Sequence, residues 1–200
     1  MDWELHNSLV PQGMSPVAGL DEAGRGPLFG AVYAAAVILP DGYELEGLDD
    51  SKKLTEKKRE KLYDIIIRDA VSWGVGICTP EEIDSINILN AAMLAMKRAA
   101  ENMAVKPGFL LVDGNTYRGF DLPGKAVIGG DAKIPSIAAA SILAKVSRDR
   151  YCLEMDEKYP QYGLKKHKGY PTKDHYAAIL EHGPSPLHRM SFLKKLYGEK

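Results

Sequence analysis

Apolar and polar positions fall along the chain in blocks whose periods predict the secondary structure. Two segments rich in small and β-branched residues flank a glycine turn in 17–40 (VAGLDEAGRGPLFGAVYAAAVILP), which predicts two joined strands with Pro40 at the end of the second. Short apolar runs at 71–78 (VSWGVGIC), 108–114 (GFLLVDG) and 125–130 (KAVIGG) predict three more strands. The chain therefore has five candidate strands.

Helical periodicity separates these runs. Segment 54–70 repeats apolar residues at helical spacing behind a capping Thr55. Thr79, Pro80 and Glu82 predict a second helix start, because threonine caps, proline suits the first turn and the glutamate completes a capping box. We expect that helix to run to about residue 104, with a break near Asp84–Asn87. Further helices are predicted from near Ser136 to Tyr159, at Lys173–His182 and at Pro186–Tyr197, after a loop rich in Gly, Pro, Tyr, His and Lys.

A strand pair followed by alternating strands and helices predicts an α/β fold with a mixed central sheet flanked by helices. We divide the chain into an N-terminal extension (1–16), a central α/β domain (17–158) and a basic, helical C-terminal extension (159–200).

The distribution of charge along the chain indicates what kind of partner the protein binds. The net charge of −1 conceals nine lysines and arginines against three acids from Lys158 onward, a local charge of +6 that leaves −7 for the rest. A basic end on an acidic body indicates a polyanionic partner such as nucleic acid, although an ordinary solvated surface explains the composition equally well.

Composition also indicates the cellular compartment. Two cysteines form no disulfide framework or zinc pattern, which favours a reducing cytosol. The first residues lack a signal-peptide pattern, and no apolar run approaches the roughly 20 residues that span a bilayer. We therefore expect a cytoplasmic protein with no membrane partner, and nothing demands an oligomer, so we expect a monomer.

Four acids carry the candidate chemistry. Asp21 and Glu22 end one predicted strand, Asp113 ends another, and Asp131 follows a third. Loops at strand ends build the sites of open α/β sheets, and carboxylate oxygens are the ligands of hard divalent cations. Because adjacent strand residues face opposite ways, Asp21 and Glu22 share a site only if the backbone bends or one side chain reaches round. A lone Asp at a strand end is more often a turn residue, but four together indicate a metal site.

The turn Gly24-Arg25-Gly26 follows these acids directly. It is interpreted either as a plain hairpin turn or as a close-approach site whose amides and arginine meet phosphate oxygens. The motif is weak alone, and its position after Asp-Glu gives it weight.

These motifs together resemble a known family. GLDEAGRGPLFGAV, LDDSKKLTEKKRE, VDG, GDAKIPSIAAASILAKVSRDR and YPQYGLKKHKGYPT are similar to type 2 ribonuclease H (ribonuclease HII, bacterial form), in the expected order from about residue 17 to about 175. The resemblance implies a ribonuclease H-like fold with a C-terminal helical extension. It also implies metal-dependent hydrolysis of the RNA strand of RNA–DNA hybrids, and cleavage 5′ of ribonucleotides embedded in duplex DNA, leaving 3′-hydroxyl and 5′-phosphate ends.

The resemblance also implies residue roles. Asp21, Glu22, Asp113 and Asp131 would bind two ions, Mg²⁺ or Mn²⁺, and Asp149 is favoured as a structural partner of nearby arginines instead. The Gly24-Arg25-Gly26 turn would meet the 2′-hydroxyl through its backbone, the group that separates RNA from DNA. Tyr170 would stack on the next sugar. His167 is a candidate for proton transfer but is better explained as a phosphate or surface contact. Candidate phosphate contacts, each equally explicable as solvated surface, are Ser51, Lys52, Lys145, Arg148 and Lys168.

Two other functions stay open at this stage. A metal phosphatase for a small molecule also uses acids at strand ends, but its activity should survive high salt, which weakens duplex binding. A non-catalytic nucleic-acid binding module would cleave nothing, so Asp21→Asn, expected to keep binding and abolish cleavage, separates it from a nuclease.

Overall fold

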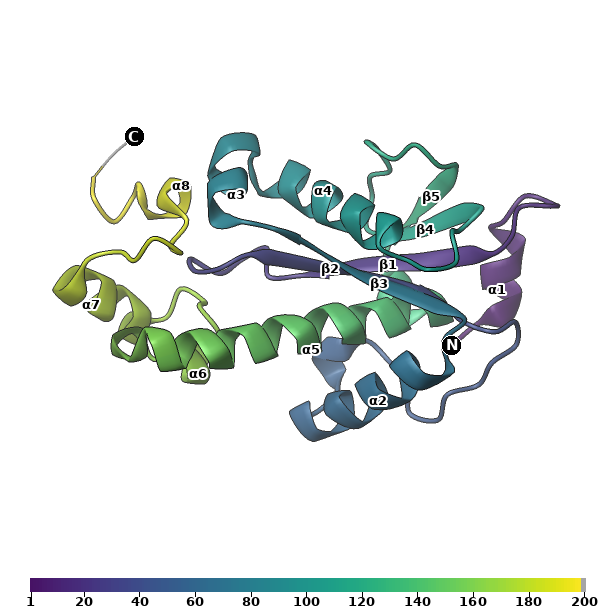
Figure 1. The fold of residues 1–200 in the computed structure, drawn as a ribbon, viewed down its shortest axis with the longest axis horizontal. Helices are drawn as coiled ribbons and strands as arrows, with labels where there is room; N and C mark the ends of the chain where they lie inside the picture. Colours follow the sequence, from purple (N-terminus) through teal and green to yellow (C-terminus); the bar gives the residue numbers. More distant parts are fainter. Residues whose placement is uncertain (199–200) are drawn as a thin grey trace.

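The computed structural model describes residues 1–198, so the last two residues of the predicted C-terminal extension, Glu199 and Lys200, lie outside the described chain. A five-stranded mixed sheet forms the centre, with helices on both faces (Figure 1). The strand order is β3-β2-β1-β4-β5, with antiparallel pairs β1/β2 and β2/β3 and parallel pairs β1/β4 and β4/β5. The strands are β1 (Val17–Ala23), β2 (Val32–Ile38), β3 (Ser72–Cys78), β4 (Phe109–Asp113) and β5 (Gly124–Val127).

Each of the five predicted strands is present, and the mixed α/β fold is confirmed. The predicted helices are also present, as α2 (Glu56–Asp69), α3 (Pro80–Ile86), α4 (Ile88–Glu101), α5 (Pro135–Lys158) and α7 (Lys173–His182). Among residues 1–198, no helix combines the length and the apolar character that crossing a lipid bilayer requires.

The helix N-caps predicted from the sequence are present in the structure. The Thr79 hydroxyl accepts from the Glu82 amide at 3.3 Å, and the Glu82 carboxylate accepts from the Thr79 amide at 2.9 Å. The expected break comes at Asn87, whose φ of 66° ends α3 and whose side chain caps α4.

Other elements were missed or misjudged. The first segment contains α1 (Trp3–Ser8), and the region expected to be a loop after Tyr159 contains η3 (Pro160–Tyr162) and α6 (Leu164–His167). The last helix, α8 (Met190–Leu193), is much shorter than the predicted Pro186–Tyr197. Short turns of helix also occur at η1 (Ser51–Lys53) and η2 (Gly130–Ala132). Each of these missed elements is six residues or fewer, too short for a helical period to show in the sequence.

Two apolar layers cover the sheet. Helix α4 packs its alanine-rich face on one side of β1 and β2, and α5 lies on the other side with α2 outside it (Figure 1). Residues 135–144 of α5 are buried on all sides because they lie between the sheet and α2, which explains why they are apolar apart from Ser136 and Ser141. Alanines on β2 and α5 let these layers approach closely.

The C-terminal helices lie beyond the end of the sheet where β1 leads into β2 (Figure 1). Phe29, in the β1–β2 connection, pairs with His188, and the Arg189 amide donates to the Leu28 carbonyl at 2.8 Å. A separate small core around Phe29 holds this region together. The loop after the paired acids is therefore built against the C-terminal segment.

Candidate functional site

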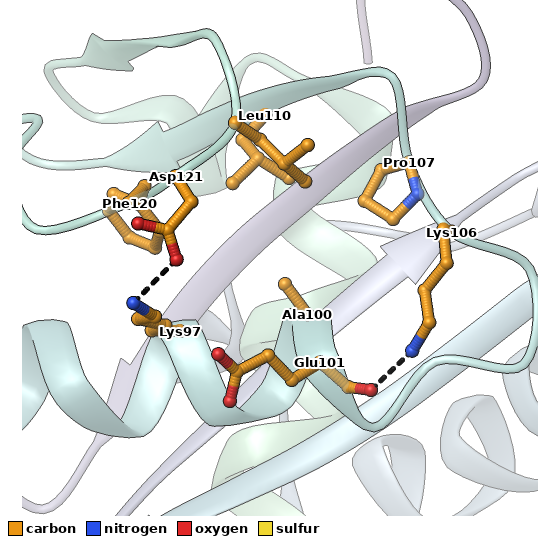
Figure 2. Close-up of a pocket in the computed structure, with 9 residues that line it drawn as sticks. Lys97, Ala100, Glu101, Lys106, Pro107, Leu110, Phe120 and Asp121 are labelled. Carbon is orange, nitrogen blue, oxygen red and sulfur yellow. Dashed lines mark hydrogen bonds and ion pairs between the residues drawn. The ribbon is translucent and has the colours of Figure 1, made fainter.

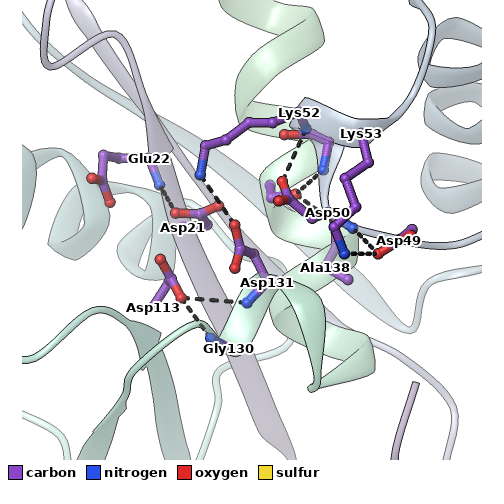
Figure 3. Close-up of polar contacts among 12 residues, drawn as sticks. Asp21, Glu22, Asp49, Asp50, Lys52, Lys53, Asp113, Gly130, Asp131 and Ala138 are labelled. Carbon is purple, nitrogen blue, oxygen red and sulfur yellow. Dashed lines mark hydrogen bonds and ion pairs between the residues drawn. The ribbon is translucent and has the colours of Figure 1, made fainter.

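Three carboxylates from separate segments converge at one end of the sheet. Asp21 of β1, Asp113 at the end of β4 and Asp131 of η2 each offer an oxygen, and these oxygens lie within 4.8 Å of one another (Figure 3). Asp21 and Asp131 are buried and Asp113 is half-buried. The sequence prediction that these distant acids meet is correct.

Parallel pairing brings the first two together. Leu20 of β1 pairs with Val112 of β4, so the next residues, Asp21 and Asp113, follow side by side on neighbouring strands. The Asp113 carboxylate then accepts from the Gly130 amide at 2.7 Å and from the Asp131 amide at 3.3 Å. These two bonds fix the start of η2 against β4, and they bring Asp131 to the other two acids.

Burial and mutual repulsion shift the protonation of these acids. Burial raises the pKa of Asp21 well above its ordinary value, and the charges of Glu22 and Asp113 raise it further. Burial, followed by the charge of Asp131, also raises the pKa of Asp113, although two backbone amides oppose this. A hard divalent cation binds carboxylate oxygens and would relieve the electrostatic repulsion between these three acids. The residues therefore fit such an ion.

A lysine partly offsets this charge. Lys52 Nζ donates to Asp131 Oδ2 at 3.1 Å (Figure 3). Burial lowers the pKa of Lys52, but its hydrogen bond and attraction to Asp131 outweigh that effect and raise the pKa overall. The side chain is 75% exposed, so Lys52 reaches the acids from the solvent side.

Glu22 does not join the three-carboxylate group. Strand β1 keeps regular pairing through Glu22 and Ala23, so the bend that would turn both adjacent acids to one side is absent. The Glu22 carboxylate instead accepts from Arg25 at 3.3 Å. It still lies near enough to Asp113 for that charge to add to burial in raising its pKa, against the opposing effect of Arg25. Its role as a metal ligand stays a prediction.

The Gly24-Arg25-Gly26 turn lies against Tyr170. Gly24 has a φ of 98°, and a Cβ there would overlap the Arg148 guanidinium, so this position needs glycine. A Cβ on the exposed Gly26 would lie 3.4 Å from the Tyr170 ring, which is itself 43% exposed. The structure therefore brings together the turn and the tyrosine that the resemblance singles out.

The predicted phosphate contacts divide into exposed and buried residues. Ser51 and Arg148 are 5% and 1% exposed, so both side chains are buried in this structure, and their contacts with phosphate stay predictions. Arg148 points inward and donates to the carbonyls of Phe29 and Lys168. Lys168 is half-buried, and its Nζ donates to the Lys165 carbonyl.

Asp149 lies outside the three-carboxylate group and binds basic side chains. It accepts from Lys145 at 2.6 Å and lies 3.8 Å from Arg59. Its predicted structural role is confirmed, with a lysine as its nearer partner. The same bond occupies Lys145, a candidate phosphate contact.

His167 uses both ring nitrogens within its own loop. Nε2 bonds the Tyr162 carbonyl at 2.8 Å, and Nδ1 accepts from the Gly169 amide at 3.2 Å. These bonds shape the segment before Tyr170, and the proton-transfer and surface-contact roles of His167 stay predictions.

Sequence reasoning missed Arg189. Its side chain is fully buried and donates to four backbone carbonyls of the turn and the segment after it. The available signal was an arginine inside an otherwise apolar and histidine-containing stretch, SPLHRMSFL. Such an arginine is buried only when it is fully hydrogen-bonded.

An apolar cavity of about 420 Å³ lies elsewhere, between the end of α4, the start of β4 and the loop before β5 (Figure 2). Lys97 and Asp121 form a 2.7 Å ion pair there, and Phe120 and Leu110 supply apolar walls. None of the candidate site residues lines it, and Leu110 belongs to β4 well before the Asp113 end. This cavity is not the candidate site.

Comparison with known proteins points to one family. The family model for ribonuclease HII matches residues 18–195. The chain is 53% identical over 197 residues to ribonuclease HII of Vibrio vulnificus (strain YJ016), covering 98% of this chain and 95% of the relative. It is 57% identical over 176 residues to ribonuclease HII of Bacteroides thetaiotaomicron, covering 88% of each. Among solved structures, ribonuclease H2 from Pyrococcus horikoshii OT3 superposes with a TM-score of 0.73 at 27% identity, over 92% of this chain and 99% of that one.

Proposed function

The chain belongs to the ribonuclease HII family, and from that premise we propose that Asp21, Asp113 and Asp131, with Glu22 beside them, hold divalent cations for the reaction. The enzyme is a metal-dependent endonuclease that hydrolyses the RNA strand of RNA–DNA hybrids and acts on ribonucleotides embedded in duplex DNA. The observation that carries the proposal is the convergence of three carboxylate oxygens within 4.8 Å, next to the Gly24-Arg25-Gly26 turn.

We propose two ions, Mg²⁺ or Mn²⁺. When bound, such ions lower the pKa of a water nucleophile and stabilise the charge on the leaving oxygen. The cluster supports this proposal through its crowded charges, because a single lysine, Lys52, compensates only part of them. Asp113, held by two amides, would keep its oxygen aimed at the cluster through the reaction.

The chain's other residues would select the scissile bond. We propose that the amides of the turn bind the 2′-hydroxyl and adjoining phosphate oxygens, and that Tyr170 packs on the next sugar. A planar ring against a deoxyribose gains contact area and disfavours an added hydroxyl. Cleavage would then fall 5′ of the ribonucleotide and leave 3′-hydroxyl and 5′-phosphate ends.

Exposed basic residues would hold the duplex by its phosphates. We place Lys52 among them, with Lys168 and Lys145 as residues that exchange their present partners for phosphate on binding. We propose a monomer at work in the cytoplasm, where bacterial DNA lies.

The direct test uses a DNA duplex that contains one ribonucleotide, labelled at one end, incubated with and without Mg²⁺. We expect one cut, 5′ of the ribonucleotide, only with the metal, and no cut with Asp21→Asn although that variant still binds the duplex. Cleavage by Asp21→Asn at the unsubstituted rate would overturn the metal-site assignment. Activity that survives at high salt on a small phosphate ester, with none on the duplex, would favour a phosphatase instead.

A further inference from the structure

Arg189 makes a connection that the active-site motifs do not account for. Its guanidinium Nη2 donates to the Gly24 carbonyl at 2.7 Å, and Nη1 donates to the Arg25 carbonyl at 3.1 Å and to the Pro27 carbonyl at 2.8 Å. Its Nε donates to the Gly30 carbonyl at 2.8 Å. One side chain from the C-terminal segment thus holds four carbonyls within seven residues of the β1–β2 connection.

These bonds determine where the amides of the turn point. In a trans peptide, the carbonyl of one residue and the N–H of the next point in opposite directions. The Gly24 and Arg25 carbonyls point inward to Arg189, so the N–H groups of Arg25 and Gly26 point outward. The same relation holds at Pro27, where the opposite N–H, that of Leu28, donates to the Gly169 carbonyl at 2.8 Å.

The two outward amides are available to a ligand. Within the described residues neither the Arg25 nor the Gly26 amide donates a hydrogen bond to the protein, and both residues are exposed. They lie beside the Tyr170 ring, which approaches Gly26. Successive free backbone N–H groups form a concavity suited to an anionic or hydroxyl oxygen.

The electrostatics of the region point the same way. Arg189 is fully buried, and Arg148, 1% exposed, lies close enough for its charge to add to burial in lowering the pKa of Arg189 to about 9. Neither arginine forms an ion pair with a carboxylate of residues 1–198. Backbone carbonyls accept hydrogen bonds from both, and the buried Nε of Arg148 has no partner among these residues. Two buried guanidinium groups without an ion-pair partner among residues 1–198 lie behind the turn, and their charge favours an anionic oxygen at the Arg25 and Gly26 amides.

We propose that Arg189 is the positioning residue that turns the Arg25 and Gly26 amides toward the ribose 2′-oxygen, and thereby sets the enzyme's preference for a ribonucleotide over a deoxyribonucleotide. This inference rests on the proposed function, since it concerns the same substrate. Lysine cannot replace Arg189, because a single ammonium on a flexible stem lacks the planar fork that serves four carbonyls.

The test measures sugar discrimination separately from general affinity. In an Asp21→Asn background with Mg²⁺, fluorescence anisotropy gives the dissociation constant for a duplex with one ribonucleotide and for the matched all-DNA duplex. With Arg189 present, we expect the ribonucleotide duplex to bind about tenfold more tightly, the value of one good hydrogen bond. With Arg189→Lys, we expect the ratio to fall to within about twofold of unity, while affinity for the all-DNA duplex stays the same.

Arg98→Lys is the matched control. Arg98 also donates to a backbone carbonyl, that of Ile77, and it pairs with Glu82, but it bonds none of the four carbonyls that Arg189 holds. The ratio of its dissociation constants for the all-DNA and ribonucleotide duplexes should stay near tenfold.

If Arg189→Lys does not fold, as judged by circular dichroism, Phe192→Leu takes its place. The Phe192 ring supports the guanidinium at 5.3 Å, and its loss should lower the ratio about threefold.

Each result has a distinct meaning. A ratio near unity when Arg189 is present would contradict the proposed function itself. A ratio that stays near tenfold in Arg189→Lys, or an equal loss of affinity for both duplexes, would overturn the role of Arg189, because the first leaves the amides in place and the second indicates a purely structural residue.

Discussion

At the scale of single residues, crowding the acids lowers the stability of the metal-free fold, although the same crowding provides the ligands for a cation. Asp21 is buried beside two other carboxylates, and both burial and repulsion raise its pKa. Its folded-state pKa therefore exceeds its unfolded value, so the folded protein binds the proton more tightly. The ionised form destabilises the metal-free fold. The penalty is fully present above the folded-state pKa, declines as the pH falls below it, and is lost only below the unfolded-state pKa.

Asp21→Asn should therefore raise the melting temperature of the metal-free protein at neutral pH. Each 1 kcal/mol of relieved repulsion corresponds to about 2–4 °C for a chain of this size. Differential scanning calorimetry at several pH values checks this, and the gain should shrink toward acidic pH. Glu46→Gln, at an exposed acid, is the control and should change little. A lower melting temperature for Asp21→Asn at neutral pH would show that the acids do not repel one another in the fold.

Gly24 gives a second residue-scale prediction. Its φ of 98° and the Arg148 side chain both exclude a Cβ, whereas Gly13, with φ of 81°, has open space around it. Gly13→Ala should cost about 1 kcal/mol of backbone strain alone, and Gly24→Ala should cost about 1–3 kcal/mol more because Arg148 must move. Urea unfolding measures both. Equal costs for the two variants would mean that the close approach of Arg148 is unimportant.

At the scale of elements, the sequence predicted the helices and strands that have an extended hydrophobic pattern or clear capping and turn residues at their ends. The five strands, α2, α5, α7 and the capping box at Thr79 follow from such patterns. The convergence of Asp21 and Asp113 was predicted because each lies near the end of a predicted strand, and the parallel pairing of β1 with β4 brings them together. What the sequence could not show depends on tertiary packing. The direction of Glu22 follows from unbroken pairing of β1, and the burial of Arg148 and Arg189 follows from the C-terminal segment packing against the turn.

The contact between α5 and β1 connects packing to the site. A Cβ on Gly19 would overlap the backbone of α5 at Ser136 and Ile137. Gly19→Ala should therefore push α5 outward, cost about 1–3 kcal/mol, and weaken Mn²⁺ binding because η2 and Asp131 precede α5 directly. Urea unfolding and metal titration give the two readouts.

Gly74→Ala is the control for that variant, because Gly74 packs as closely on the α4 backbone, across the other face of the sheet. It should cost similar stability and leave the affinity for Mn²⁺ unchanged. If both variants bind Mn²⁺ like the unsubstituted protein, α5 does not govern the position of Asp131.

At the scale of the whole molecule, the basic C-terminal region and the acid cluster serve opposite needs. In the proposed function, the acids would bind cations, and the lysines would bind the polyanion that those acids would otherwise repel. The affinity for a duplex should therefore fall steeply with salt, in proportion to the number of phosphates neutralised. This dependence separates a duplex-binding enzyme from a small-molecule phosphatase.

Lys168→Gln should lower the salt slope of duplex binding by about 0.9, the change expected for one phosphate contact on B-form DNA. Lys106→Gln should leave it unaltered, since Lys106 precedes β4 at the end of the sheet opposite to Asp113. Anisotropy titrations across a range of potassium chloride concentrations give both slopes. An identical slope for Lys168→Gln and the unsubstituted protein would remove Lys168 from the interface.

The most direct measurement is a titration of the metal-free protein with Mn²⁺, followed by electron paramagnetic resonance. We expect saturable binding that is lost or greatly weakened in each of Asp21→Asn, Asp113→Asn and Asp131→Asn. Asp149→Asn, at a buried acid outside the group, should bind Mn²⁺ like the unsubstituted protein. Unchanged binding in any of the first three variants would contradict a shared cation site at this end of the sheet.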